Sequence, residues 1–113
     1  MQVVAIREWG DILGTRSLGQ KVRADIHGRL KMSGTAPVTV DFAGITVMTQ
    51  SFADECFAKL AAEIGAQAFK ERLRFKNPNA EVAAVLTYAV RHRQQRDKLN
   101  LVDAKGSGGS ETP

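Results

Sequence analysis

The sequence is poor in cysteine and in long apolar segments. Its 113 residues include one cysteine, Cys56, so no internal disulfide can form and a reducing compartment is the simpler setting. No apolar run approaches the roughly 18 residues that a membrane-spanning helix needs. The first residues, MQVVAIREWG, lack the basic start and long apolar stretch of a secretion signal. We therefore expect a cytoplasmic protein without membrane contact.

The sequence also lacks the short motifs that mark common catalytic and nucleotide-binding sites. It has no dinucleotide fingerprint, phosphate-binding loop, nucleophile elbow or metal-type spacing of cysteine and histidine. His27 and His92 fall on different predicted helices, and Cys56 lies on an apolar stripe typical of a buried thiol. These absences favour a protein that is not an enzyme and holds no cofactor or metal. Metal-assisted hydrolysis at Asp41 and Asp54 stays open as an enzymatic alternative.

The composition is that of an ordinary small globular domain, with 43% hydrophobic and 25% charged residues. A chain of this length can bury a core without disulfides or metal. Sixteen basic residues against twelve acidic ones give a net charge of +4, which permits nucleic-acid binding without arguing strongly for it. We expect one domain over residues 1–103 and a disordered Gly/Ser-rich tail over 104–113.

Hydrophobic periodicity predicts strands that alternate with helices. The strands, which are rich in β-branched residues or alternate apolar with polar ones, are expected at residues 2–7, 38–42 and 72–76. The helices, each with an apolar stripe, are expected at residues 17–32, 51–64 and from 79 onward. Their expected N-caps are Ser17, Ser51 and Asn79.

This pattern predicts an α/β fold: a single small domain in β-α-β-α-β-α order, with helices mainly on one face of a short sheet. Strict alternation in two of the strands indicates that the other face is open and polar. The open face is expected to carry Thr39, Asp41, Arg72, Arg74 and Lys76. The three basic residues of that set form a candidate nucleic-acid-binding or nucleotide-binding surface, with a solvated sheet face as the structural alternative.

The junction between the second strand and the second helix contains the most informative motif, DFAGITVMTQSFADECF. It resembles the STAS-like family of bacterial and phage proteins, in which a strand ending in Asp-Phe-x-Gly leads to a Gln-x-Phe-Ala-Asp-Glu motif that opens a helix. Upstream, GTRSLGQKV resembles that family's Ser/Thr-Arg-Ser segment. The resemblance covers roughly residues 13 to 92 and implies a single STAS-like domain.

More distantly, the junction is similar to the STAS domains of anti-sigma-factor antagonists. Those proteins dock a kinase-type anti-sigma factor and are switched by phosphorylation of a serine at this position of the fold. The resemblance therefore implies a non-enzymatic regulatory module that docks a partner protein, such as a histidine-kinase-like ATPase, through the junction Thr49–Glu55. The expected contact residues are Arg16, Ser17, Gln50, Phe52, Asp54 and Glu55.

The phosphorylation switch does not carry over with the docking surface. The position that matches the phosphorylated serine is Gln50, which has no hydroxyl, so Thr49 and Ser51 are the remaining candidate phosphoacceptors. Ser51 has a structural alternative as an N-cap that accepts from the backbone NH of Asp54. Asp54 and Glu55 likewise have one, as favourable charges in the first turn of a helix.

Arg16 is the basic residue that we single out beside the junction. Helices that follow parallel strands begin at the same edge of the sheet, so Arg16 is expected near the Gln50–Glu55 segment. There it would either bind an anion or pair with Asp54 or Asp41. The sequence alone leaves both alternatives open.

Overall fold

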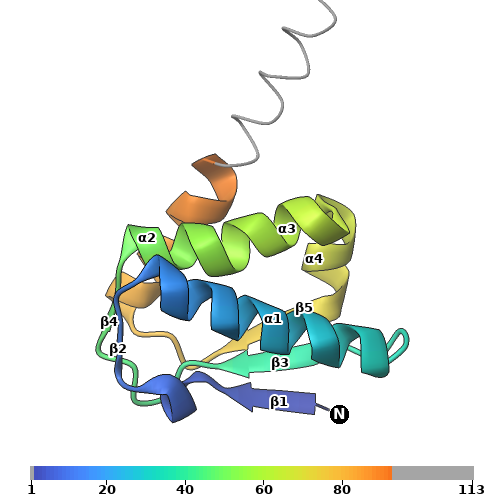
Figure 1. Ribbon diagram of the computed structural model, residues 1–113, viewed down its shortest axis with the longest axis horizontal. Helices are drawn as coiled ribbons and strands as arrows, with labels where there is room; N and C mark the ends of the chain where they lie inside the picture. The colour runs from blue at the N-terminus through green and yellow to red at the C-terminus, as the bar shows by residue number, and fades with distance from the viewer. Residues whose placement is uncertain (1, 93–113) are drawn as a thin grey trace, which may run out of the picture.

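The computed structural model describes residues 2–92, which form a parallel sheet with helices packed on one of its faces (Figure 1). The strands of this sheet pair in the order β1 (Gln2–Ala5), β3 (Val38–Asp41), β5 (Leu73–Lys76). The register aligns Val4 with Val40 and Val40 with Phe75 on the helix-covered face. The predicted α/β fold with helices on one face is confirmed.

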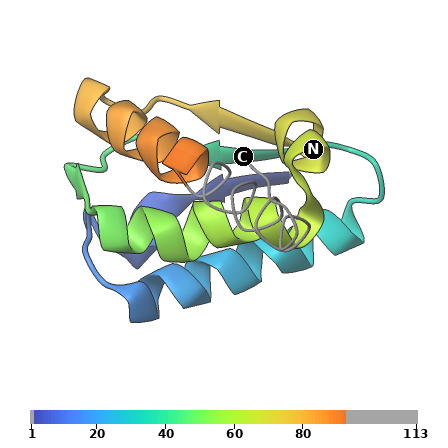
Figure 2. The same ribbon diagram turned by 90° about the horizontal axis from the view of Figure 1, so that it is seen from above.

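The helices follow the apolar stripes of the sequence closely. They are α1 (Arg16–Met32), α2 (Gln50–Ala53), the π-helical turn η2 (Asp54–Ala58), α3 (Lys59–Ile64), α4 (Ala66–Arg72) and a last helix over residues 80–92. Figure 2 shows α1 on the β1 side of the molecule and the last helix on the β5 side, with α2 to α3 between them. Asn79 caps the last helix by accepting from the backbone NH of Val82 at 2.8 Å, as predicted.

The core is built around phenylalanine rings from both layers. Phe57 of η2 lies 5.8 Å from Phe42 and 5.7 Å from Phe75 between ring centroids, and Phe52 lies 6.2 Å from Phe57. Phe69 completes the cluster at 5.8 Å from Phe75. These contacts join the helical layer to the strands, because the rings interlock at the distances that aromatic pairs prefer.

Two predicted helix caps are wrong by two residues each. Thr15, not Ser17, caps α1 and accepts from the backbone NH of Leu18 at 3.1 Å. Thr49, not Ser51, caps α2. Ser17 and Ser51 therefore lie inside the first turns of their helices, where both are exposed. In both segments two hydroxyl residues stand two positions apart, and either one can satisfy the free NH groups of a first turn.

Short elements that the sequence did not predict surround the expected ones. A 3-10 turn η1 (Ile6–Trp9) shortens the first strand, and β2 (Ile12–Leu13) pairs in parallel with β4 (Val47–Met48) as a separate two-stranded ladder. The helix α4 fills residues 66–72, so the last strand begins at Leu73 rather than Arg72. These pieces are too short for periodicity to reveal them.

The open face of the sheet differs from the prediction at two positions. Thr39 is buried rather than exposed. Arg72 ends α4 and turns toward the C-terminus of α1, where its Nη2 donates to Leu30 O at 2.8 Å and to Ser33 Oγ at 3.0 Å. Arg74 and Lys76 remain exposed on the open side of β5.

The predicted domain end at residue 103 and the predicted Gly/Ser-rich tail over 104–113 lie outside the described residues. None of the helices within residues 2–92 combines the length and the apolar composition that a membrane span requires.

Candidate functional site

The junction end, defined as the edge where β2 leads into α1 and β4 leads into α2, brings two helix starts together (Figure 1). The backbone NH of Thr49 donates to Leu13 O at 2.9 Å, which continues the β2–β4 ladder into the helix start. The Thr49 hydroxyl donates to Gly14 O at 3.1 Å and accepts from the NH of Phe52 at 3.2 Å. This candidate phosphoacceptor is therefore half-buried, with its oxygen engaged on both sides.

Arg16 lies beside the junction, as the sequence predicts. Its Nη1 contacts Asp54 Oδ2 at 3.1 Å and Glu55 Oε1 at 3.4 Å. The hydrogen bond that Arg16 donates to Asp54 is the largest influence on the guanidinium and raises its pKa further. Of the predicted alternatives, the structure shows the pair with Asp54. Asp41 lies elsewhere, at the end of β3.

Glu55 is the centre of a buried ion network between α1 and the second helical segment. Its side chain is only 4% exposed, yet it contacts Lys59 Nζ at 3.0 Å and Arg23 Nη2 at 3.4 Å in addition to Arg16. Burial opposes ionisation and raises the pKa of Glu55, but the hydrogen bond and charge of Lys59 lower it. With the contributions of Arg16 and Arg23, the pKa ends below its ordinary value. The carboxylate is thus ionised and fully engaged inside the molecule.

Two residues predicted to contact a partner are buried and cannot do so in this structure. The ring of Phe52 has no exposed surface and belongs to the phenylalanine cluster. The carboxylate of Glu55 is already paired with the cations of the ion network described above. Their motif positions are explained by packing and by ion pairing. Cys56, also fully buried, has a thiol whose pKa is raised by burial, so it is not an activated nucleophile.

The other predicted contact residues, together with the candidate phosphoacceptor Ser51, reach the surface at this end of the fold. Arg16 is 55% exposed, Asp54 is partly exposed, and Ser17, Gln50 and Ser51 are exposed. Four of these five line a hollow of about 230 Å³, named here the junction hollow. Its lining residues are Arg16, Gln50, Ser51, Asp54, Tyr88, Ala89 and His92.

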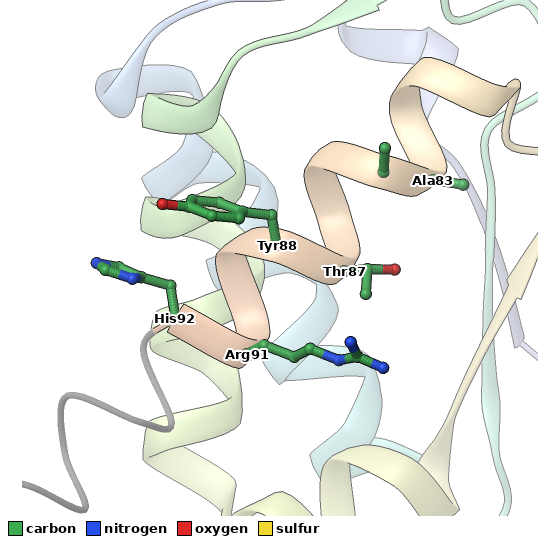
Figure 3. Close-up of a pocket in the computed structure, with 6 residues that line it drawn as sticks. Ala83, Thr87, Tyr88, Arg91 and His92 are labelled. Atoms are coloured by element: carbon green, nitrogen blue, oxygen red, sulfur yellow. The ribbon is translucent and has the colours of Figure 1, made fainter.

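Tyr88 and His92 of the last helix were missed by the sequence analysis as site residues. They project to the same side of that helix (Figure 3), with parallel rings 5.4 Å apart at an interplanar angle of 8°. They also border a wider hollow of about 600 Å³ whose described lining comes from this helix alone. The signal that could have found them is an aromatic residue and a histidine four positions apart, off the apolar stripe of the helix.

The structure supports the basic sheet face as a nucleic-acid interface less well than the sequence suggested. Arg72 donates hydrogen bonds to the C-terminus of α1, so Arg74 and Lys76 are the members of the predicted trio that remain on the open side. Asp41 shares that side, and its Oδ1 accepts from the Ala43 NH and from Asn77 Nδ2, each at 3.0 Å. The Ala43 hydrogen bond, followed by that of Asn77, lowers the pKa of Asp41.

The carboxylates proposed for a hydrolase are engaged in separate contacts. Asp41 bonds within the turn after β3, whereas Asp54 pairs with Arg16 at the junction end. Across residues 2–92, no group of three histidine, cysteine or carboxylate side chains is placed to hold a metal ion. The structure thus does not bring Asp41 and Asp54 together as a two-carboxylate site.

Comparison with known proteins gives a family over more than half of the chain. The sequence profile of the STAS-like domain of unknown function (DUF4325) matches residues 18–83. No curated protein and no solved structure matches the chain at a significant level. The matched segment contains Gln50, Ser51 and Asp54 of the junction hollow, while Arg16 and Tyr88 lie just outside it.

Proposed function

We propose that this chain, which belongs to the STAS-like domain family, is a regulatory module that captures a partner protein at its junction end. The resemblance to anti-sigma-factor antagonists favours a histidine-kinase-like ATPase or another anti-sigma-type regulator as the partner. In this proposal the polar contacts come from Arg16, Ser17, Gln50 and the partly exposed Asp54. Phe52 and Glu55 act from beneath the surface by fixing α2 and η2 against α1.

The observation that carries the proposal is an exposed apolar pair at the same end of the fold. Ile12 of β2 and Val47 of β4 are register partners, and their side chains are 60% and 42% exposed. They stand a few residues before the starts of α1 and α2. Protein interfaces commonly join an apolar centre to a polar rim, and here Gln50 and Arg16 supply the polar groups.

The open sheet face lacks this combination. Val3 is 46% exposed on β1, but its in-register neighbour Thr39 is buried. The charged residues on that face, Arg74 and Lys76, share it with Asp41, whose carboxylate offsets part of their charge. A protein-docking role is therefore better supported at the junction end than a nucleic-acid role on the sheet.

The test compares two exposed valines on short parallel strands. The tagged 113-residue chain and its Val47→Asp and Val3→Asp variants are each used to capture partners from the native host, and the captured proteins are identified by mass spectrometry. A charge in the centre of an interface removes binding energy of hot-spot size, so we expect recovery of the partner to fall about tenfold or more in Val47→Asp. Recovery with Val3→Asp is expected to equal that of the wild type.

Circular dichroism and a melting curve confirm that both variants are folded before the capture is interpreted. Equal recovery of the same protein by all three chains would place the docking surface elsewhere. If the wild-type protein recovers only nucleic acid, and Arg74→Gln does not recover it, the function would be assigned to the open sheet face.

A further inference from the structure

The junction hollow is assembled from three segments that are distant in the sequence. Arg16 is the first residue of α1, Gln50, Ser51 and Asp54 belong to the α2–η2 segment, and Tyr88 comes from the last helix. Figure 2 shows that the α2 segment lies between the other two helices, and the hollow takes its lining from all three segments. A site built in this way exists only in the folded chain.

Two ion pairs hold the orientation of Arg16 in the hollow, and part of its guanidinium remains available to donate further hydrogen bonds. Asp54 and Glu55 both contact the same atom, Nη1. A guanidinium has five N–H donors in a planar fork, so two carboxylates on one nitrogen hold the plane while the rest of the fork stays available. The 55% exposure of the side chain leaves that part of the fork accessible to a ligand.

Tyr88 and His92 form the opposite wall. Their stacked rings restrain each other, and Tyr88 is 57% exposed. The phenol and the imidazole add hydrogen-bonding groups to the amide of Gln50 and the hydroxyl of Ser51. The hollow thus presents several hydrogen-bond donors, and the carboxylate in its lining, Asp54, already accepts from Arg16.

We infer that the junction hollow receives a carboxylate side chain, an Asp or Glu of the docked partner, which pairs with Arg16 between Gln50 and Tyr88. This inference rests on the proposed docking function and names the chemistry that the partner presents. A carboxylate matches the planar fork of arginine with two parallel hydrogen bonds. A volume of about 230 Å³ is below the range typical of small-molecule pockets and suits a single side chain.

The test uses the isolated glutamate side chain as the probe. The isotope-labelled 113-residue chain is titrated with N-acetyl-glutamate methylamide and followed by amide chemical shifts in NMR. The uncharged N-acetyl-glutamine methylamide is the matched control, and inorganic phosphate is titrated in parallel. We expect saturable shifts at the amides of Gln50, Ser51 and Tyr88 with a dissociation constant in the millimolar range, as for a single ionic contact.

Variants assign the shifts to the hollow. Arg16→Gln is expected to abolish saturation, while Arg74→Gln, which removes an exposed arginine from the sheet face, leaves it unchanged. Tyr88→Ala keeps the ion pairs of Arg16 and is expected to weaken binding of the glutamate probe severalfold. It tests the inference independently if the Arg16→Gln protein does not fold.

Three results would overturn the inference: equal shifts with the glutamine probe, undiminished saturation in Arg16→Gln, or no saturable shift with glutamate. Saturation by phosphate without saturation by glutamate would also overturn it, in favour of a phosphorylated ligand. The docking proposal is judged separately by Val47→Asp. If that variant loses the partner while the glutamate titration is negative, docking stands and the carboxylate assignment alone fails.

Discussion

Gly19 of α1 lies directly against Glu55 of η2. A β-carbon built on Gly19 would stand 3.0 Å from Cβ of Glu55 and 3.1 Å from the backbone oxygen of Phe52. The absence of a side chain at Gly19 lets α1 approach the second helical segment closely enough for Arg16 and Arg23 to reach the buried Glu55 carboxylate. The close approach and the ion network are therefore two parts of the same helix contact.

The first prediction compares alanine substitutions at two glycines of α1. Alanine normally stabilises a helix interior by about 1 kcal/mol relative to glycine. A β-carbon at Gly28 meets nothing within 4 Å, so we expect Gly28→Ala to raise the free energy of unfolding by about 0.5–1 kcal/mol. Gly19→Ala forces a backbone contact and is expected to lower it by about 1–2 kcal/mol. Urea denaturation measures both, and equal gains would show that α1 can move away from η2.

The second prediction concerns the charge of Glu55. Replacing it with glutamine leaves Arg16, Arg23 and Lys59 without their shared carboxylate, so Glu55→Gln is expected to cost about 1–3 kcal/mol at pH 7. Glu63→Gln, at a side chain that is 42% exposed, is the matched control and is expected to change stability by less than about 0.5 kcal/mol.

The lowered pKa of Glu55 also leads to a prediction for the pH dependence of stability. Folding lowers the pKa of Glu55 below its ordinary value of 4.5, so its contribution is present above pH 4.5 and is lost as the pH falls through the folded pKa. The difference in unfolding free energy between wild type and Glu55→Gln should therefore shrink below pH 4.5. A difference that stays constant into acid would contradict the assignment of an ionised, buried carboxylate.

The third prediction separates the two hydroxyls of the junction. Thr49→Ala removes the cap of α2 and the hydrogen bond to Gly14 O, and is expected to cost about 1–2 kcal/mol. Ser51→Ala removes an exposed hydroxyl from the first turn and is expected to change stability by no more than about 0.5 kcal/mol. Thermal melts of the two proteins check this order, and a larger loss in Ser51→Ala would restore Ser51 as the cap.

The fourth prediction distinguishes the arginines that the sequence placed together on the sheet. Arg72→Ala breaks charged hydrogen bonds to Leu30 O and Ser33 Oγ, and is expected to lower the unfolding free energy by about 1.5–3 kcal/mol. Arg74 donates to the exposed backbone oxygen of Glu71 at 3.0 Å, so Arg74→Ala is expected to be nearly neutral. Similar losses in both variants would contradict the role of Arg72 at the end of α1.

Periodicity predicted the parts of the fold that local sequence controls. The stripe Val22–Ile26–Leu30 fixed the buried face of α1, and alternation in Val38–Asp41 fixed the central strand, because burial of apolar side chains dictates both patterns. The two-residue strands β2 and β4 escaped prediction. Their pairing joins segments far apart in the chain and leaves no pattern within either one.

The candidate site was predicted in position but only partly in composition. The parallel-strand topology predicted Arg16 beside the Gln50–Glu55 segment, and the structure shows Arg16 paired with Asp54. Burial of Glu55 depends on cations that α1 contributes across a helix contact, and the approach of Tyr88 depends on how the last helix packs. Neither relationship is encoded in the spacing of nearby residues.

The most direct test of the docking surface is site-specific photo-crosslinking in the native host. A photoreactive amino acid is placed at Ser51, on the junction hollow, and in a second protein at Lys76, on the open sheet face; both positions are exposed. The docking account predicts that one partner protein becomes attached at Ser51 and not at Lys76. Attachment at Lys76 alone, or at neither position, would contradict it.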